Sequence, residues 1–175
     1  TKMPTMIKGA ALSCILSDTL EFRSPTTTDL DRSIAEKLAL DLGIDMKSYA
    51  SQLFKAKSDV SNYTDPELIL MDSKKYDVGG KKLRISVMET TKPAEILKRK
   101  KSLLKAMEEI EEKECVDQIL FFVIDILKEE AILLVPNNLV KEITEKSFGK
   151  SSGGDTIVLP GILSRKKQII PQLKL

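Results

Sequence analysis

The stretch KYDVGGKKLRISVME, residues 75–89, carries the pattern that decides the fold. The Gly-Gly pair at 79–80 separates two short runs, which is typical of a β-hairpin. In the second run, apolar Leu83, Ile85 and Val87 alternate with polar residues, as expected for a strand with one buried face. This part of the chain therefore predicts a sheet that begins with an antiparallel pair of strands.

Helical and strand patterns alternate in the remainder of the second half. Residues 93–114 are charged, with apolar positions at helical spacing, and predict one long helix. Residues 119–126 and 131–135 are apolar enough for central strands, 138–148 predicts a helix and 156–159 a last strand. The fold class that we predict is α/β, a mixed β-sheet with helices packed on it and further helices before it.

The first 57 residues carry helical patterns only. Residues 7–20, IKGAALSCILSDTL, are small and apolar almost throughout and predict a buried helix. A second helix, 28–42, begins at an N-cap threonine and is amphipathic. Its apolar positions recur at spacing four: Leu30, Ile34, Leu38 and Leu42. Residues 46–57 predict a third helix, and the polar residues 58–62 lack periodicity, which makes them the best linker.

Composition excludes several classes of protein. The 175 residues include 28 basic and 26 acidic side chains, and a net charge of +2 is too small for a general nucleic-acid binder. No apolar run is long enough to span a bilayer and no signal-peptide pattern is present, so we expect a soluble cytoplasmic protein without a membrane partner. The absence of histidine removes histidine-based catalysis and metal ligation. Cys14 and Cys115 lack metal-ligand spacing and predict free, buried thiols.

Two groups of basic residues are candidate anion sites. Residues 165–167, Arg-Lys-Lys, lie between the apolar pairs 162–163 and 169–170. An arginine fork flanked by lysines suits a polyanion pocket, while a solvated tail is the alternative. Lys74 and Lys75 follow a predicted helix end, where a cation is also favourable for structural reasons alone.

Asp18 ends the first predicted helix, where the helix dipole disfavours a negative charge. One interpretation is that its carboxylate caps the following turn, 19–22. The other is that it is a hard ligand for a divalent cation. No complete catalytic signature, such as a Walker loop or a GxSxG elbow, occurs in the chain.

Four segments resemble one known family. SRKKQIIPQL, residues 164–173, resembles the C-terminal signature of the manganese-dependent, family II inorganic pyrophosphatases of the DHH phosphoesterase superfamily. Residues 11–31, ALSCILSDTLEFRSPTTTDLD, resemble the segment that carries the last metal-binding aspartate of that family. Residues 68–90, LILMDSKKYDVGGKKLRISVMET, and 121–127, FFVIDIL, resemble parts of its C-terminal substrate domain.

The resemblance implies roles for individual residues. Asp18 would be a ligand of a dinuclear metal site that lies mostly outside this chain, and Lys74, Arg165 and Lys166 would bind substrate phosphate. The metal would be Mn²⁺, with Co²⁺ or Mg²⁺ as alternatives.

The resemblance also implies a domain division and a reaction. Residues 1–57 would be the C-terminal tail of the metal-binding DHH domain, 58–62 a linker and 63–175 the substrate-binding domain. The complete enzyme would hydrolyse pyrophosphate to two phosphates with a metal-activated water, and this chain would supply the cationic lobe. The partners would be pyrophosphate or polyphosphate, the missing N-terminal metal-binding domain and, in a homodimer, a second copy.

Because a single carboxylate cannot hold a dinuclear site, we expect the chain alone to be inactive. Three alternatives stay open. They are an exopolyphosphatase-like phosphoesterase, a non-catalytic module that binds phosphate or polyphosphate, and an assembly domain that associates through the apolar face of residues 10–20.

Overall fold

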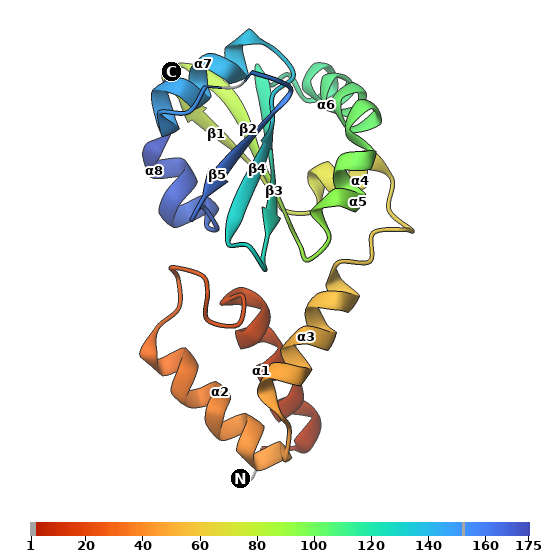
Figure 1. Ribbon diagram of the computed structural model, residues 1–175, viewed down its shortest axis with the longest axis vertical. Coiled ribbons are helices and arrows are strands. Elements are labelled where there is room, and N and C mark those ends of the chain that lie inside the picture. The colour runs from red at the N-terminus through yellow and green to blue at the C-terminus, as the bar shows by residue number, and fades with distance from the viewer. Residues whose placement is uncertain (1–2, 152) are drawn as a thin grey trace. The chain divides into compact units, whose positions relative to one another are not determined.

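A computed structural model describes residues 3–151 and 153–175 (Figure 1). The chain divides into two compact units, Thr1–Asp59 and Val60–Leu175. Among the described residues, the first unit contains helices and no strand, and the second is built on a sheet. Each unit is described by itself.

The N-terminal unit consists of three helices, α1 (Thr5–Asp18), α2 (Asp29–Leu42) and α3 (Met46–Lys57). The predicted start of α2 is confirmed, because the Thr28 hydroxyl accepts a hydrogen bond from the Asp31 amide and the Asp31 carboxylate accepts one from the Thr28 amide. Gly43 ends the helix with a φ of 65°, a conformation that glycine adopts without strain. Helix α1 packs against both α2 and α3.

Two burial predictions for this unit are wrong. Helix α1 buries only Leu12 and Leu16, whereas Met6 is 86% exposed, because its apolar residues lie on all sides and its two neighbours cover one side. In α2, Leu38 is buried as predicted but Leu30 and Ile34 are exposed. The buried side of α2 runs instead through two alanines and one leucine: Ala35, Leu38 and Ala39. Small side chains allow the close helix contact that a stripe of leucines would prevent.

The C-terminal unit contains one five-stranded sheet with the strand order β1-β2-β3-β4-β5. The strands β2 and β3 pair in parallel, and the other neighbouring pairs are antiparallel, so the predicted mixed sheet is confirmed. The strand bounds are β1 Ser73–Val78, β2 Lys81–Thr90, β3 Gln118–Asp125, β4 Glu130–Leu134 and β5 Thr156–Pro160. Positive φ values of 56° and 80° at Gly79 and Gly80 form the tight turn of the β1–β2 hairpin.

The helices of this unit cover both faces of the sheet (Figure 1). Their bounds are α4 Asp65–Leu70, α5 Pro93–Lys98, α6 Lys100–Glu114, α7 Asn138–Phe148 and α8 Ile170–Gln172, with a π-helical turn, η1, at Arg165–Ile169. Phe121 and Val123 of β3 lie in one core cluster with side chains of α4, α5 and α6. Phe122, on the other face, meets Phe148 of α7 edge-on at 6.3 Å between ring centroids. Strand β3 is therefore buried on both faces, which explains its unbroken apolar sequence.

The predicted single helix 93–114 is in fact two helices, α5 and α6, which meet at Arg99. The Arg99 guanidinium donates hydrogen bonds to the carbonyl of Tyr63, at 2.8 Å, and of Val60, and pairs with the Asp65 carboxylate at 2.7 Å. These contacts hold Arg99 against the segment that precedes and starts α4. Helical periodicity continues through the break, so the sequence pattern could not reveal it.

Candidate functional site

The cationic residues 165–167 lie in a π-helical turn near the end of the chain. The Ser164 carbonyl accepts hydrogen bonds from the Gln168 amide at 2.9 Å and the Ile169 amide at 3.0 Å, and the Ser164 hydroxyl accepts one from the Lys167 amide. Ile169 is fully buried. The buried isoleucine and the serine cap therefore fix the main chain from which Arg165 and Lys166 project, in a helix type that often marks functional sites.

The side chain of Gln168 fixes the residues immediately before the cations. Its Oε1 accepts hydrogen bonds from the amides of Leu163, at 2.8 Å, and Ser164, at 3.0 Å. Its Nε2 donates to the Gly161 carbonyl at 2.6 Å. Both ends of the side-chain amide are thus used to close the turn that leads into Arg165.

Arg165 connects this turn to the start of the sheet. Its Nη1 donates to the carbonyls of Asp72, at 2.8 Å, and Ile85, at 3.4 Å, and its Nη2 donates to Asp72 Oδ1 at 2.7 Å. The Arg165 side chain is only 12% exposed. Because Asp72 directly precedes β1, the structure brings the end of the chain to within two residues of Lys74 along β1.

Lys74 and Lys166 are both exposed, and neither ammonium group makes a hydrogen bond or ion pair with residues that the structure describes. Lys74 lies in β1 opposite Ile85, the residue whose carbonyl accepts from Arg165. The main chain of Lys74 and the guanidinium of Arg165 therefore meet at one place on the β1–β2 pair.

The neighbouring Lys75 has a different environment from Lys74. Its ammonium group pairs with the Glu114 carboxylate at 2.8 Å, and the buried Arg84 guanidinium contacts the same carboxylate. The hydrogen bond from Lys75, with a further one from Arg84, lowers the pKa of Glu114 below its ordinary value. Lys75 therefore joins β1 to the end of α6, which is a structural role.

Asp18 is the last residue of α1 and is exposed. No hydrogen bond or ion pair joins its carboxylate to the described part of the chain. The following turn is capped by Thr19, whose hydroxyl donates to the Ile15 carbonyl at 2.7 Å and accepts from the Phe22 amide at 3.2 Å. Thr19, and not Asp18, thus performs the capping that the sequence left open for Asp18.

The turn after Asp18 has an unusual backbone. Leu20, Glu21 and Phe22 have φ values of 52°, 53° and 68°. Three successive residues other than glycine thus adopt the left-handed conformation, which is unfavourable for residues that have a Cβ atom. Arg32 of α2 supports it, since its Nη2 donates to the Phe22 carbonyl at 3.1 Å and its guanidinium lies 4.8 Å from the centre of the Phe22 ring. Such strained segments cluster at functional sites.

A dinuclear metal centre needs several carboxylate, thiolate or imidazole ligands close together. Within residues 3–151 and 153–175, no group of three or more Cys, Asp or Glu side chains is close enough together to hold a metal ion. The described residues therefore do not complete such a centre by themselves. Asp18 is available as a single carboxylate ligand.

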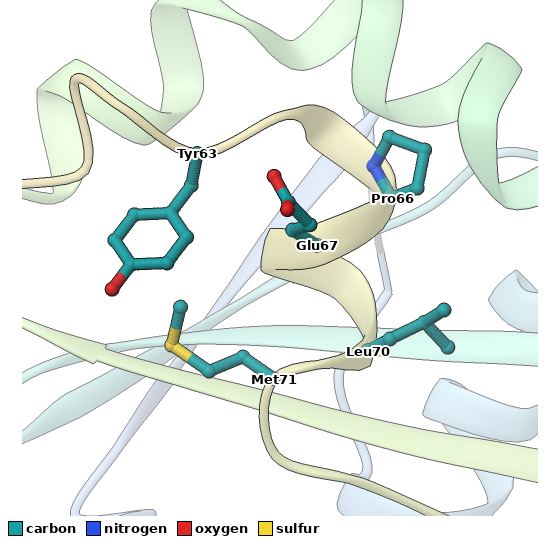
Figure 2. Close-up of a pocket in the computed structure, with 5 residues that line it drawn as sticks. All are labelled: Tyr63, Pro66, Glu67, Leu70 and Met71. Atoms are coloured by element: carbon teal, nitrogen blue, oxygen red, sulfur yellow. The ribbon is translucent and has the colours of Figure 1, made fainter.

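A separate apolar hollow lies beside α4 (Figure 2). Its lining consists of Tyr63, Pro66, Glu67, Leu70 and Met71. The one charged group in it, the Glu67 carboxylate, accepts hydrogen bonds from the amide and hydroxyl of Thr64, which lower the pKa of Glu67. This hollow contains no cation and is unsuited to phosphate.

Cys14 and Cys115 are free but exposed, so the prediction of buried thiols is wrong. Cys14 lies on the side of α1 opposite Leu12 and Leu16, and Cys115 caps the end of α6 in a left-handed conformation.

Among the helices of the described ranges, none combines the length and apolar character that crossing a bilayer requires.

Comparison with known proteins places this arrangement in a family. The DHHA2 domain model matches residues 51–175. A manganese-dependent inorganic pyrophosphatase of Methanocaldococcus jannaschii is 41% identical over 169 residues, which are 96% of this chain and 54% of that protein. The manganese-dependent inorganic pyrophosphatase of Bacillus subtilis is 35% identical over 172 residues, 98% of this chain and 55% of that protein.

A solved structure agrees with the sequence matches. The crystal structure of a Methanococcus jannaschii protein described as a family II inorganic pyrophosphatase superposes with a TM-score of 0.85 at 39% identity, over 98% of this chain and 56% of that one. The chain thus spans about half the length of the curated relatives it matches, in their C-terminal part. Sequence and structure together show that the chain belongs to the DHHA2 domain family.

Proposed function

We propose that this chain is the phosphate-binding part of a manganese-dependent inorganic pyrophosphatase, which hydrolyses pyrophosphate to two phosphates. The names of its relatives support the activity. The observation that carries the proposal is the meeting of two cationic segments, since Arg165 bonds to Asp72, two residues before Lys74. Two segments 93 residues apart in the chain are thereby combined into one place that can bind an anion.

In this proposal the cations have complementary roles. Arg165 supplies a planar fork whose direction is fixed by the protein, and Lys74 and Lys166 supply mobile charges. Together they would neutralise the phosphoryl oxygens and hold the substrate in place during hydrolysis. Since neither lysine has a partner in the described part of the chain, binding phosphate breaks no ion pair of theirs.

Asp18 would act as one ligand of the manganese site. A divalent cation beside it would compensate for a carboxylate at a helix C-terminus, which is otherwise unfavourable. The remaining ligands would come from outside the described residues, so the water-activating step belongs to the complete enzyme. Cobalt or magnesium as the metal, a homodimer and a cytoplasmic location are further proposals that rest on the family resemblance alone.

We also propose a domain assignment. Residues 1–57 would form the tail of the metal-binding DHH domain, 58–62 the linker and 63–175 the substrate-binding domain. The division into compact units at residues 59 and 60 supports a linker at this place. The all-helical first unit and the sheet-based second unit support two different structural origins.

A binding experiment tests the proposed phosphate site. Pyrophosphate is titrated calorimetrically into the 175-residue chain and its variants Arg165→Ala and Lys166→Ala, with Lys105→Ala as the control, because Lys105 is 79% exposed on α6 away from the site. Loss of Arg165 should weaken binding roughly 10- to 100-fold, since hydrogen bonds to charged groups contribute about 1.5–3 kcal/mol. Equal affinity of the Arg165→Ala variant and the control would contradict the assignment.

A second experiment separates binding from catalysis. Phosphate release from pyrophosphate is followed with manganese, first for the chain alone and then for a longer protein that also contains the metal-binding domain. We expect release only from the longer protein, and expect Asp18→Asn to abolish it. Release by the chain alone, lost in its Arg165→Ala variant, would show that the chain contains a complete catalytic centre. Preference for tripolyphosphate over pyrophosphate would instead favour the exopolyphosphatase-like alternative.

A further inference from the structure

The hydrogen bonds of Arg165 use only part of its guanidinium. Two oxygens of Asp72 accept from the two terminal nitrogens, the main-chain oxygen from Nη1 and Oδ1 from Nη2. The second hydrogen bond of Nη1 goes to the Ile85 carbonyl. In the described part of the chain, Nε makes no hydrogen bond, and Nη2 makes only one. Three of the five N–H groups of the guanidinium are thus used in the described part of the chain, which leaves the N–H of Nε and one N–H of Nη2 as donors for a ligand.

We propose that Asp72 is a positioning residue, which orients Arg165 so that its Nε–Nη2 edge binds two oxygens of one phosphate group. This inference rests on the proposed function, because it assigns the manner in which that site holds its substrate. A bidentate contact adds directional specificity to the charge attraction, and it requires that the plane of the guanidinium be fixed.

The contacts show why the carboxylate of Asp72 is needed for this orientation. Without it, Arg165 would keep only its two Nη1 bonds to main-chain carbonyls. The guanidinium could then pivot about Nη1, and Nη2 would have no acceptor in the described part of the chain. The Oδ1 bond is the one contact that fixes the second end of the fork.

A purely structural role explains Asp72 less well. The Asp72 side chain is 56% exposed, whereas that of its partner Arg165 is 12% exposed, so water competes for the carboxylate end of the pair and weakens its contribution to stability. A carboxylate next to an anion site also repels the anion, which lowers affinity unless the carboxylate provides something else. Orientation of Arg165 is what the observed geometry provides.

The test is a comparison of pyrophosphate affinities in the full 175-residue chain. The variants are Asp72→Ala, Asp72→Asn and Arg165→Lys, together with the double variant Asp72→Ala/Arg165→Lys. Asp77→Ala is the control, since Asp77 is an exposed aspartate of β1 with another neighbourhood. Calorimetric titration gives the affinity, and thermal unfolding of each variant gives the Tm.

We expect Asp72→Ala to weaken pyrophosphate binding about tenfold with little change in Tm, because one aligned, charge-assisted hydrogen bond is lost. Asp72→Asn should restore most of the affinity, since an amide oxygen still accepts from Nη2. In the Arg165→Lys background, Asp72→Ala should have no effect, because a lysine is a point charge without a plane to orient.

Three results would overturn the inference. The first is unchanged or tighter binding by Asp72→Ala, which would show that its charge only repels the substrate. The second is an equal loss in the Arg165→Lys background, which would show that Asp72 does not act through the guanidinium. The third is a wild-type chain that does not bind pyrophosphate, which would remove the proposed function as well. If Arg165→Ala weakens binding and Asp72→Ala does not, the proposed function stands and only the positioning role falls.

Discussion

Two turns of the molecule carry candidate functional charges, and they hold those charges in opposite ways. In the turn around η1, Gln168 fixes the main chain and Asp72 fixes the Arg165 guanidinium. In the turn after α1, Thr19 fixes the main chain, but the Asp18 carboxylate has no hydrogen bond or ion pair with the residues described. Both backbones are irregular, and only one of the two charged groups is oriented by its own unit.

The difference follows from what each group would bind. A guanidinium binds phosphate through a planar fork, so its direction must be set before the anion arrives. A carboxylate that binds a metal is oriented by the cation and by the other ligands around it. In the proposed roles, the C-terminal unit would organise phosphate binding with its own residues, whereas Asp18 would need further metal ligands from elsewhere.

The largest expected change in the free energy of unfolding comes from the buried side chain that anchors the η1 turn in the core. Ile169 is fully buried in η1, and Ile169→Ala should lower the free energy of unfolding by about 2–5 kcal/mol through the cavity it leaves. Val158→Ala, at a site that is 46% exposed, should change it by less than about 0.5 kcal/mol. Urea unfolding of both variants measures the difference. Equal losses of unfolding free energy in the two variants would show that burial of Ile169 does not stabilise η1.

Gln168 tests how far the same turn depends on side-chain hydrogen bonds. Gln168→Ala leaves the amides of Leu163 and Ser164 without their acceptor, so the free energy of unfolding should fall by about 1–3 kcal/mol. Gln168→Glu keeps the acceptor for these amides but sets a carboxylate oxygen against the Gly161 carbonyl, which repels it, so this variant should also be less stable than the wild type. Chemical unfolding together with pyrophosphate titration checks both variants. An unchanged free energy of unfolding in Gln168→Ala would contradict this account.

Two matched helix caps compare the units without involving either charged group. Thr28 begins α2 in the N-terminal unit and Thr64 begins α4 in the C-terminal unit, and each forms a reciprocal capping box. Replacement of either threonine by alanine should cost about 1 kcal/mol of unfolding free energy. Ser51→Ala, within α3, is the control and should cost nothing measurable. Unequal losses would mean that packing within a unit, rather than local capping, decides the effect.

The smallest effect is a contrast in pH dependence between two glutamates of α6. Burial raises the pKa of Glu111, although the Ile119 amide bonds to it, whereas Lys75 and Arg84 lower the pKa of Glu114. The contribution of Glu114 to the free energy of unfolding is therefore present above the ordinary glutamate pKa of about 4.3. It is lost as the pH falls through the lowered pKa of Glu114 in the folded protein. The contribution of Glu111 to the free energy of unfolding depends on pH in the opposite direction. It is complete below about 4.3 and is lost as the pH rises through its raised value.

Unfolding of the wild type, Glu111→Gln and Glu114→Gln, followed from about pH 3 to pH 7, checks these signs. The stability advantage of the wild type over Glu114→Gln should grow as the pH rises, while its advantage over Glu111→Gln should shrink. Parallel curves for all three proteins would contradict both assignments. The two residues lie on the same helix, so helix formation itself serves as their common reference.

Local signals in the sequence determined the elements that depend on a few neighbouring residues. The hairpin at Gly79 and Gly80, the cap at Thr28 and the bounds of α7 all agree with prediction, because turn chemistry, capping and periodicity act within a few residues. The family resemblance came from the same source, since the motifs around Asp18 and Arg165 are contiguous.

Tertiary structure alone decided what depends on distant contacts. The break at Arg99 follows from its bonds to the Tyr63 carbonyl and the Asp65 side chain, and the exposure of Leu30 follows from which side of α2 meets α1. The ion pair between Asp72 and Arg165 joins residues 93 positions apart in the sequence. The one sequence signal for it is the place of Asp72, two residues before Lys74. Helix propensity and capping depend on neighbouring residues in the sequence. Which side of a helix becomes buried depends on tertiary packing, because the local pattern is compatible with more than one buried side.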